Sequence, residues 1–163
     1  MGEQSDLRII DFTPEYSEVF KRLNVEWITQ YWELEAADEK TLERPTEHVI
    51  DKGGAILIAI YQGHPVGSVA LIPYDESTLE LAKMAVSPEV QGKGIGLALG
   101  EAALKRAHRM GAAKVYLESN TILGPALSLY QKLGFSHLEG KAEDSPYERC
   151  NVRMERSLKR QRV

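Results

Sequence analysis

The sequence contains a single cysteine, Cys150, among 163 residues, which excludes an intramolecular disulfide. No apolar run approaches the roughly 20 residues that span a membrane, and the N-terminus shows no apolar segment of the signal-peptide type. The four histidines lack the spacing of metal ligands (His48, His64, His108 and His137). We therefore expect a cytoplasmic protein with no bound metal and no membrane partner.

Charge is unevenly distributed along the chain, although the net charge is only −4. Residues 1–50 carry twelve acidic side chains against five basic ones, whereas residues 91–114 carry five basic side chains against one acidic one. The contents of 43% apolar and 27% charged residues are those of a globular domain. No basic stripe of the kind that binds nucleic acid is present, so we expect no nucleic-acid partner.

Hydrophobic periodicity and turn residues predict alternating strands and helices in a single α/β domain. Helices are expected to begin at Thr13–Pro14 and to cover residues 26–40, 46–52, 97–110 and 125–133. Strands are expected at residues 7–12, 55–61, 66–73, 78–86, 114–119, 135–138 and 151–154. This order predicts one layer of mixed sheet with helices on both faces.

A glycine-rich turn joins the strand that ends at Val86 to the helix that follows. Glycines allow close backbone approach, and a helix start offers unpaired N–H groups to phosphate. The spacing of Gly92, Gly94 and Gly96 fits neither the dinucleotide fingerprint G-x-G-x-x-G nor the P-loop. The pattern present is Q-x-x-G-x-G, beginning at Gln91.

This pattern resembles the acyl-CoA-binding motif of the Gcn5-related N-acetyltransferases. Three more segments follow in the family's order: the strands 79–86 and 114–119, and the A-x-x-L-Y-x-K-x-G-F motif from Ala126 to Phe135. The similarity is strong from about Ala55 to Phe135. It implies a central mixed sheet of six or seven strands. It also implies one domain over 1–163, with acceptor-covering helices in 1–54, an acyl-CoA-binding core in 55–138, and a C-terminal loop, strand and tail in 139–163.

The resemblance implies direct transfer of an acetyl group from acetyl-CoA, the cosubstrate, to an amine in a ternary complex. It also implies a β-bulge near Met84 and Val86 that lets the pantetheine pair like a strand. Family members often have asparagine where this chain has Leu123, and Asn120 lies nearby. The residues expected to bind the coenzyme are Met84, Ala85, Val86, Gln91, Gly92, Lys93, Gly94, Ile95, Gly96, Asn120 and Tyr130.

Tyr130 matches the tyrosine of the family motif, whose hydroxyl acts as a general acid toward the coenzyme sulfur. A phenol with a pKa near 10 facing a thiol near 8.5 makes full proton transfer uphill by only ~2 kcal/mol. The alternative is a core tyrosine, because Leu127, Tyr130 and Leu133 share one helical face.

Glu80 is the leading candidate for the general base or the substrate anchor. In an ideal strand it shares a face with Ala82, Met84 and Val86. Glu118, on the neighbouring strand, is the alternative acid. If both face one cleft, their repulsion raises one pKa, as a base requires. The alternative is that Glu80 is an ordinary surface carboxylate without a role in the reaction.

The acceptor site is expected to involve Trp27, Tyr31, Trp32 and Tyr147 together with Glu118, although aromatic residues at helical spacing are more often core. The acceptor is a small-molecule amine or a peptide N-terminus, and the sequence does not distinguish them. The alternative function is a CoA-binding regulatory or interaction module without turnover. The oligomeric state, a homodimer included, stays open, as does acyl-chain preference beyond acetyl.

Overall fold

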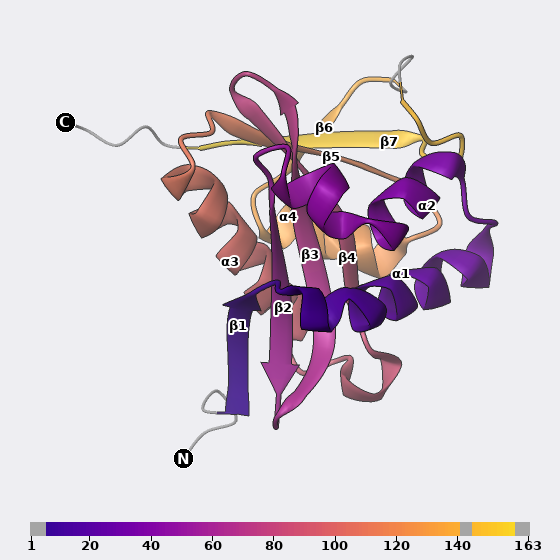
Figure 1. Ribbon diagram of the computed structural model, residues 1–163. Coiled ribbons are helices and arrows are strands. Elements are labelled where there is room, and N and C mark those ends of the chain that lie inside the picture. Colours follow the sequence, from indigo (N-terminus) through magenta and orange to yellow (C-terminus); the bar gives the residue numbers. More distant parts are fainter. Residues whose placement is uncertain (1–5, 141–144, 159–163) are drawn as a thin grey trace.

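The computed structural model describes residues 6–140 and 145–158, which form a seven-stranded mixed sheet with helices on both faces (Figure 1). The strands are β1 Leu7–Asp11, β2 Ala55–Tyr61, β3 His64–Asp75, β4 Thr78–Val86, β5 Lys114–Ser119, β6 Ser136–Leu138 and β7 Val152–Ser157. The longer helices are α1 Ser17–Tyr31, α2 Ala36–Glu43, α3 Ile95–Arg109 and α4 Gly124–Lys132. Short 3-10 turns at Pro14–Tyr16 and Pro88–Val90 and a π-helical turn at Thr46–Ile50 complete the described elements.

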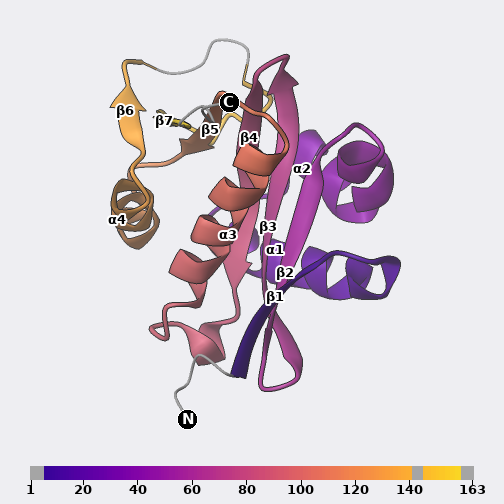
Figure 2. The same ribbon diagram turned by 90° about the vertical axis from the view of Figure 1, so that its left-hand side faces the viewer.

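The strand order is β1-β2-β3-β4-β5-β7-β6, with β4 and β5 parallel and the other neighbours antiparallel. Helices α1 and α2 cover one face and α3 covers the other (Figure 2). This confirms the predicted mixed sheet of six or seven strands with helices on both faces. Among the described residues, no helix is long and apolar enough to cross a membrane.

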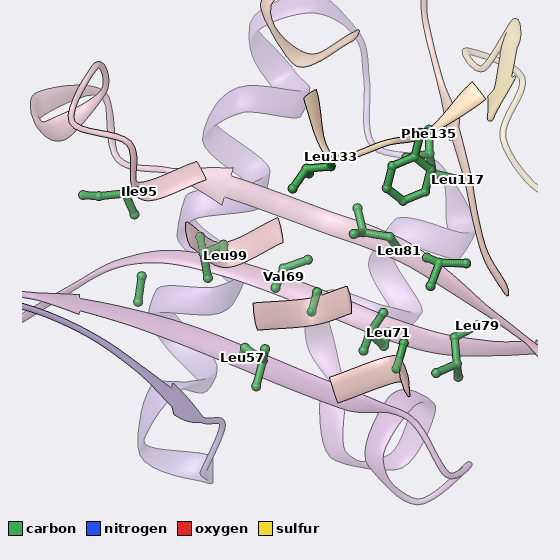
Figure 3. Close-up of a cluster of buried hydrophobic side chains, with 14 of the residues drawn as sticks. Leu57, Val69, Leu71, Leu79, Leu81, Ile95, Leu99, Leu117, Leu133 and Phe135 are labelled. Carbon is green, nitrogen blue, oxygen red and sulfur yellow. The ribbon is translucent and has the colours of Figure 1, made fainter. Parts of the chain in front are cut away.

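Two apolar clusters hold these layers together. The cluster under α3 includes Leu57, Val69, Leu71, Leu79, Leu81, Ile95, Leu99, Leu117, Leu133 and Phe135 (Figure 3). The second cluster, under α1 and α2, contains Phe20, Leu42, Val49, Ile56, Ile58, Ile60 and Ala70. Every residue of β2 is buried, because its alternate side chains enter the two clusters in turn.

The ladder between β4 and β5 has three residue pairs, and we call the place where the two strands then separate the fork. Their ladder runs from Thr78↔Lys114 to Glu80↔Tyr116, and within the described residues the rest of β4 has no strand partner on that side. Strand β5 instead pairs along its whole length with β7. The strands β5–β7, with α4, therefore lie to one side of β1–β4 (Figure 2). The cavity lined by residues of both β4 and β5 lies where these two strands separate.

A β-bulge interrupts β4 just above this fork. Ala70 faces Ala82 and Ser68 faces Ala85, so Lys83 and Met84 together stand opposite one residue of β3. Lys83 has a φ of 50°, a left-handed conformation unusual for a residue with a side chain. The bulge lies within a residue of the position that the family resemblance implies.

The bulge also corrects the ideal-register expectation for β4. Leu79 and Leu81 belong to the cluster under α3, and beyond the bulge it is Met84 and Val86 that pack against that cluster. Glu80 therefore does not share its face with Met84 and Val86. One extra residue in the strand exchanges the two faces, because side chains alternate with a period of two.

Most element boundaries fall within two or three residues of the prediction, and β4 and β5 match it fully. The single helix expected over 26–40 is wrong. Helix α1 ends at Tyr31, and α2 begins at Ala36 with a capping box between the side chains of Glu35 and Asp38.

Candidate active site

Two cavities meet beside the bulge. The first, of about 200 Å³, lies at the fork between β4 and β5. The second, of about 420 Å³, lies between the end of β4, the glycine-rich turn and α4. They share six lining residues, so they form one continuous cleft: Met84, Ala85, Val86, Gln91, Ala126 and Tyr130.

The second cavity ends on the glycine-rich turn. Gly92 and Gly94 have φ values of 85° and 81°, which favour glycine, and α3 begins at the next residue. The first intrahelical bond is donated by the N–H of Ala98 to the carbonyl of Gly94, and in the part of the chain that the structure describes no side chain caps this end of α3. The preceding N–H groups therefore lack an intrahelical acceptor, and the helix dipole favours a negative charge at this end.

The other polar residues predicted to bind the coenzyme differ in whether they line the cleft. Gln91 lines both cavities, and its side-chain amide donates to the carbonyl of Val86 at 3.2 Å. Lys93 does not line the cavity; its ammonium lies over the ring of Tyr61. Asn120 lines the first cavity, but its amide donates to the carbonyl of Arg149 and accepts from the N–H of Ile122. Its polar atoms thus shape the loop after β5.

Tyr130 stands where the two cavities join. It is half-buried on α4, its ring contacts Phe135 edge to face, and its hydroxyl makes no hydrogen bond within the described residues. Burial, reinforced by the proximity of Cys150, raises the pKa of Tyr130 to about 12. Full proton transfer to a thiolate is then uphill by about 5 kcal/mol, so hydrogen-bond donation is the role that this environment favours.

The fork itself holds two carboxylates. Glu80 is in the last pair of the β4–β5 ladder, and Glu118 lies two residues further along β5. Both line the first cavity. Burial, together with the negative charge of Glu118 and against the positive charge of Lys83, raises the pKa of Glu80 to about 7. Glu118 accepts hydrogen bonds from the hydroxyls of Tyr116 and Ser145.

Three of the four predicted aromatic residues line this cavity. They are Trp27 near the end of α1, Trp32 just after it, and Tyr147 in the loop before β7. Tyr31 does not line it; its side chain is 48% exposed and its ring contacts that of Trp32. Cys150 also lines the cavity, and burial raises its pKa to about 12, so its thiol stays protonated and is a poor nucleophile.

Comparison with known proteins identifies the family. The family model described as "Acetyltransferase (GNAT) family" matches residues 16–135. This chain belongs to the GNAT family.

Relatives agree with this assignment. The N-acetyltransferase YjgM of Escherichia coli is 34% identical over 109 residues, which is 65% of this chain and 65% of that protein. The N-acetylaspartate synthetase of Rattus norvegicus is 36% identical over 87 residues, 53% of this chain and 29% of that protein. The chain thus spans just under two thirds of the first relative and less than a third of the second.

Solved structures show the same fold. A GNAT acetyltransferase from Staphylococcus aureus superposes with a TM-score of 0.84 at 21% identity, covering 94% of this chain and 99% of that one. An acetyltransferase from Bacillus subtilis, solved in complex with CoA, superposes with a TM-score of 0.71 at 22% identity, covering 93% and 99%.

This GNAT chain also holds an ion cluster in the cleft wall that the sequence analysis missed. The guanidinium of Arg149 donates to both oxygens of Asp38, at 2.6 and 2.8 Å, and to Glu35 at 3.0 Å. The ammonium of Lys83 pairs with the same Asp38 and reaches the hydroxyl of Tyr147 at 3.2 Å. Burial raises the pKa of Asp38, but the hydrogen bonds from Arg149 and the charge of Lys83 outweigh it and lower the pKa to about 2.

A second network missed from the sequence supports the bulge from the α1 side. The Ser68 hydroxyl donates to the Lys83 carbonyl at 2.9 Å and accepts from the Asn24 amide at 3.1 Å. Asn24 in turn accepts from the indole N–H of Trp27. Asn24 and Ser68 are fully buried, and their 44-residue separation explains why no local pattern revealed them.

Proposed function

We propose that this GNAT protein transfers the acetyl group of acetyl-CoA to a primary amine by direct attack within a ternary complex. The observation that carries the proposal is the continuous cleft. One end is a helix start without a side-chain cap, the other holds a carboxylate with a pKa of about 7, and a tyrosine hydroxyl without a hydrogen-bond partner among the described residues lies between them.

The coenzyme end is proposed to hold acetyl-CoA as follows. The backbone of Gly92, Gly94 and Gly96 and the first N–H groups of α3 bind the pyrophosphate. The unpaired edge of β4 from Leu81 to Val86 offers backbone groups to the pantetheine in the manner of a strand. The bulge at Lys83–Met84 directs backbone groups toward the thioester carbonyl, where an N–H donor stabilises the oxyanion of the tetrahedral intermediate.

At the acceptor end, Glu80 removes the proton that an alkylamine carries at neutral pH. One pKa unit corresponds to about 1.4 kcal/mol, so a base near 7 rather than 4.5 lowers the cost of this step by about 3 kcal/mol. The neutral amine then forms the C–N bond, and the C–S bond breaks as the intermediate collapses. Tyr130 donates a hydrogen bond to the departing thiolate, which takes a proton from the amine by way of Glu80 or solvent.

The test is release of free thiol from acetyl-CoA in the presence of a panel of primary amines, with the acetylated amine identified by mass spectrometry. We expect release that depends on both substrates. If calorimetry shows coenzyme binding but no amine supports release, the chain is a CoA-binding module and the proposal fails.

A further inference from the structure

The charges that line the acceptor end of the cleft differ in how they are paired. Lys83 and Arg149 are 3% and 8% exposed, and both are bound to Asp38, which is 0% exposed; Arg149 also binds Glu35. Two positive and two negative side chains therefore form a neutral block in the cleft wall. Three of the five N–H donors of Arg149 are used by the carboxylates of Glu35 and Asp38, so the charge of this cation is already balanced within the block.

The two carboxylates at the fork are not neutralised in this way. Glu80 makes no hydrogen bond or ion pair within residues 6–140 and 145–158, and Glu118 is held only by the neutral hydroxyls of Tyr116 and Ser145. The other polar residues that line this cavity, Gln91, Ser119 and Asn120 among them, carry no charge. The net charge facing the acceptor is therefore negative.

The aromatic wall of the same cavity suits the body of a cationic acceptor. Trp27, Trp32 and Tyr147 contribute aromatic surface, and the indole N–H of Trp27 is already donated to Asn24. Arg149 already lies over the rings of Trp32 and Tyr147, and Lys83 lies over that of Tyr147, so this aromatic surface suits the methylene or aryl part of an acceptor. Among the described residues that line this cavity, the cations are Lys83 and Arg149, and both are already paired with Asp38, so neither is a free counter-charge for a carboxylate on the acceptor.

We infer that the acceptor is a cationic alkylamine or arylalkylamine that carries no carboxylate, in contrast to the aspartate named in the N-acetylaspartate synthetase relatives. This rests on the proposed acetyltransferase function. The acceptor enters as an ammonium ion drawn to Glu80 and Glu118, and its chain lies along the aromatic wall. A carboxylate on the acceptor would be the third at this place and would meet two like charges at short range.

Matched pairs that differ by one carboxylate test the inference: cadaverine against lysine, and tyramine against tyrosine, with aspartate as a third kind of acceptor. We expect kcat/KM for thiol release to be at least tenfold higher for the decarboxylated member of each pair. Lysine methyl ester, which masks the carboxylate, should recover most of the difference. Equal rates within the pairs, or a preference for aspartate, would overturn the inference while leaving the acetyltransferase proposal intact.

Two variants assign the selectivity to the fork. Glu118→Gln should narrow the cadaverine-to-lysine ratio at least threefold, whereas Glu101→Gln, an exposed carboxylate on α3, should leave it unchanged. The ratio of kcat/KM for cadaverine to that for lysine is compared, because Glu118→Gln also changes the pKa of Glu80 and therefore the rate with either amine. If no amine releases thiol, the acetyltransferase proposal fails, and titration calorimetry with cadaverine and lysine in the presence of CoA decides the inference. Tighter binding of cadaverine supports it, and equal or tighter binding of lysine refutes it.

Discussion

Replacement of Glu80 by glutamine separates its chemical role from its structural cost. The substitution keeps the shape of the side chain and removes the titration that burial and Glu118 place at about pH 7. In the wild type, only the deprotonated carboxylate accepts a proton, so kcat/KM should rise with pH through an apparent pKa near 7 and then level off. In Glu80→Gln this step should vanish, and kcat/KM at pH 8 should fall by about 10²–10⁴.

The stability of the wild type should change with pH in the opposite direction to its activity. A carboxyl group whose pKa is raised from 4.5 to about 7 on folding stabilises the protein below pH 4.5, and this contribution is lost as the pH rises to 7. Relative to Glu80→Gln, the wild type should therefore lose about 3 kcal/mol of unfolding free energy between pH 4.5 and 8. Denaturant unfolding at both pH values measures this difference.

The matched control for both experiments is Glu76→Gln, an exposed carboxylate in the turn before β4. It should alter neither the pH profile nor the stability difference. If Glu80→Gln keeps the wild-type step near pH 7, another group titrates there and the assignment of Glu80 as the base is wrong.

Three further substitutions probe the rest of the cleft. Tyr130→Phe should lower kcat by about 10²–10⁴ with little change in acetyl-CoA affinity, because the hydroxyl acts on the departing thiolate; an unchanged kcat where chemistry limits the rate would refute this. Gly94→Val should strongly raise the KM for acetyl-CoA, and a KM equal to that of the wild type would show that Gly94 is not part of the coenzyme site. Because position 94 has a φ of 81°, the substitution should also lower the unfolding free energy by about 1–3 kcal/mol. Asp38→Asn leaves Lys83 and Arg149 without their shared counter-ion, so denaturant unfolding should show a loss of about 3–5 kcal/mol, and a loss below 1 kcal/mol would contradict the buried pairing.

The coenzyme end of the cleft was predictable because its signals are local in the sequence. The Q-x-x-G-x-G pattern predicts the turn and the start of α3 to within a few residues. Runs of apolar and β-branched residues between turn residues predict β4 and β5. Positive φ at Gly92 and Gly94 is the conformation for which glycine is selected. One motif thus predicts both a backbone shape and a ligand.

The acceptor end depends on contacts that no local pattern encodes. Asp38 and Arg149 meet across 111 positions of sequence, and Lys83 looks like an ordinary strand residue until the bulge turns it toward α2. The bulge also reverses which side chains of β4 accompany Glu80, since a period of two is lost with one added residue. The break after Tyr31 was missed because aromatic residues continue the helical spacing across it.

Direct attack is tested most plainly by following the acetyl group itself. Wild-type protein is mixed with acetyl-CoA and cadaverine, and free thiol, acetylated amine and the intact mass of the protein are measured over a single turnover. Direct attack predicts equal amounts of thiol and acetylated amine, no thiol release without amine, and no acetyl group on the protein at any time. Thiol release without amine, or a protein mass raised by one acetyl group at Cys150 ahead of product, would contradict it.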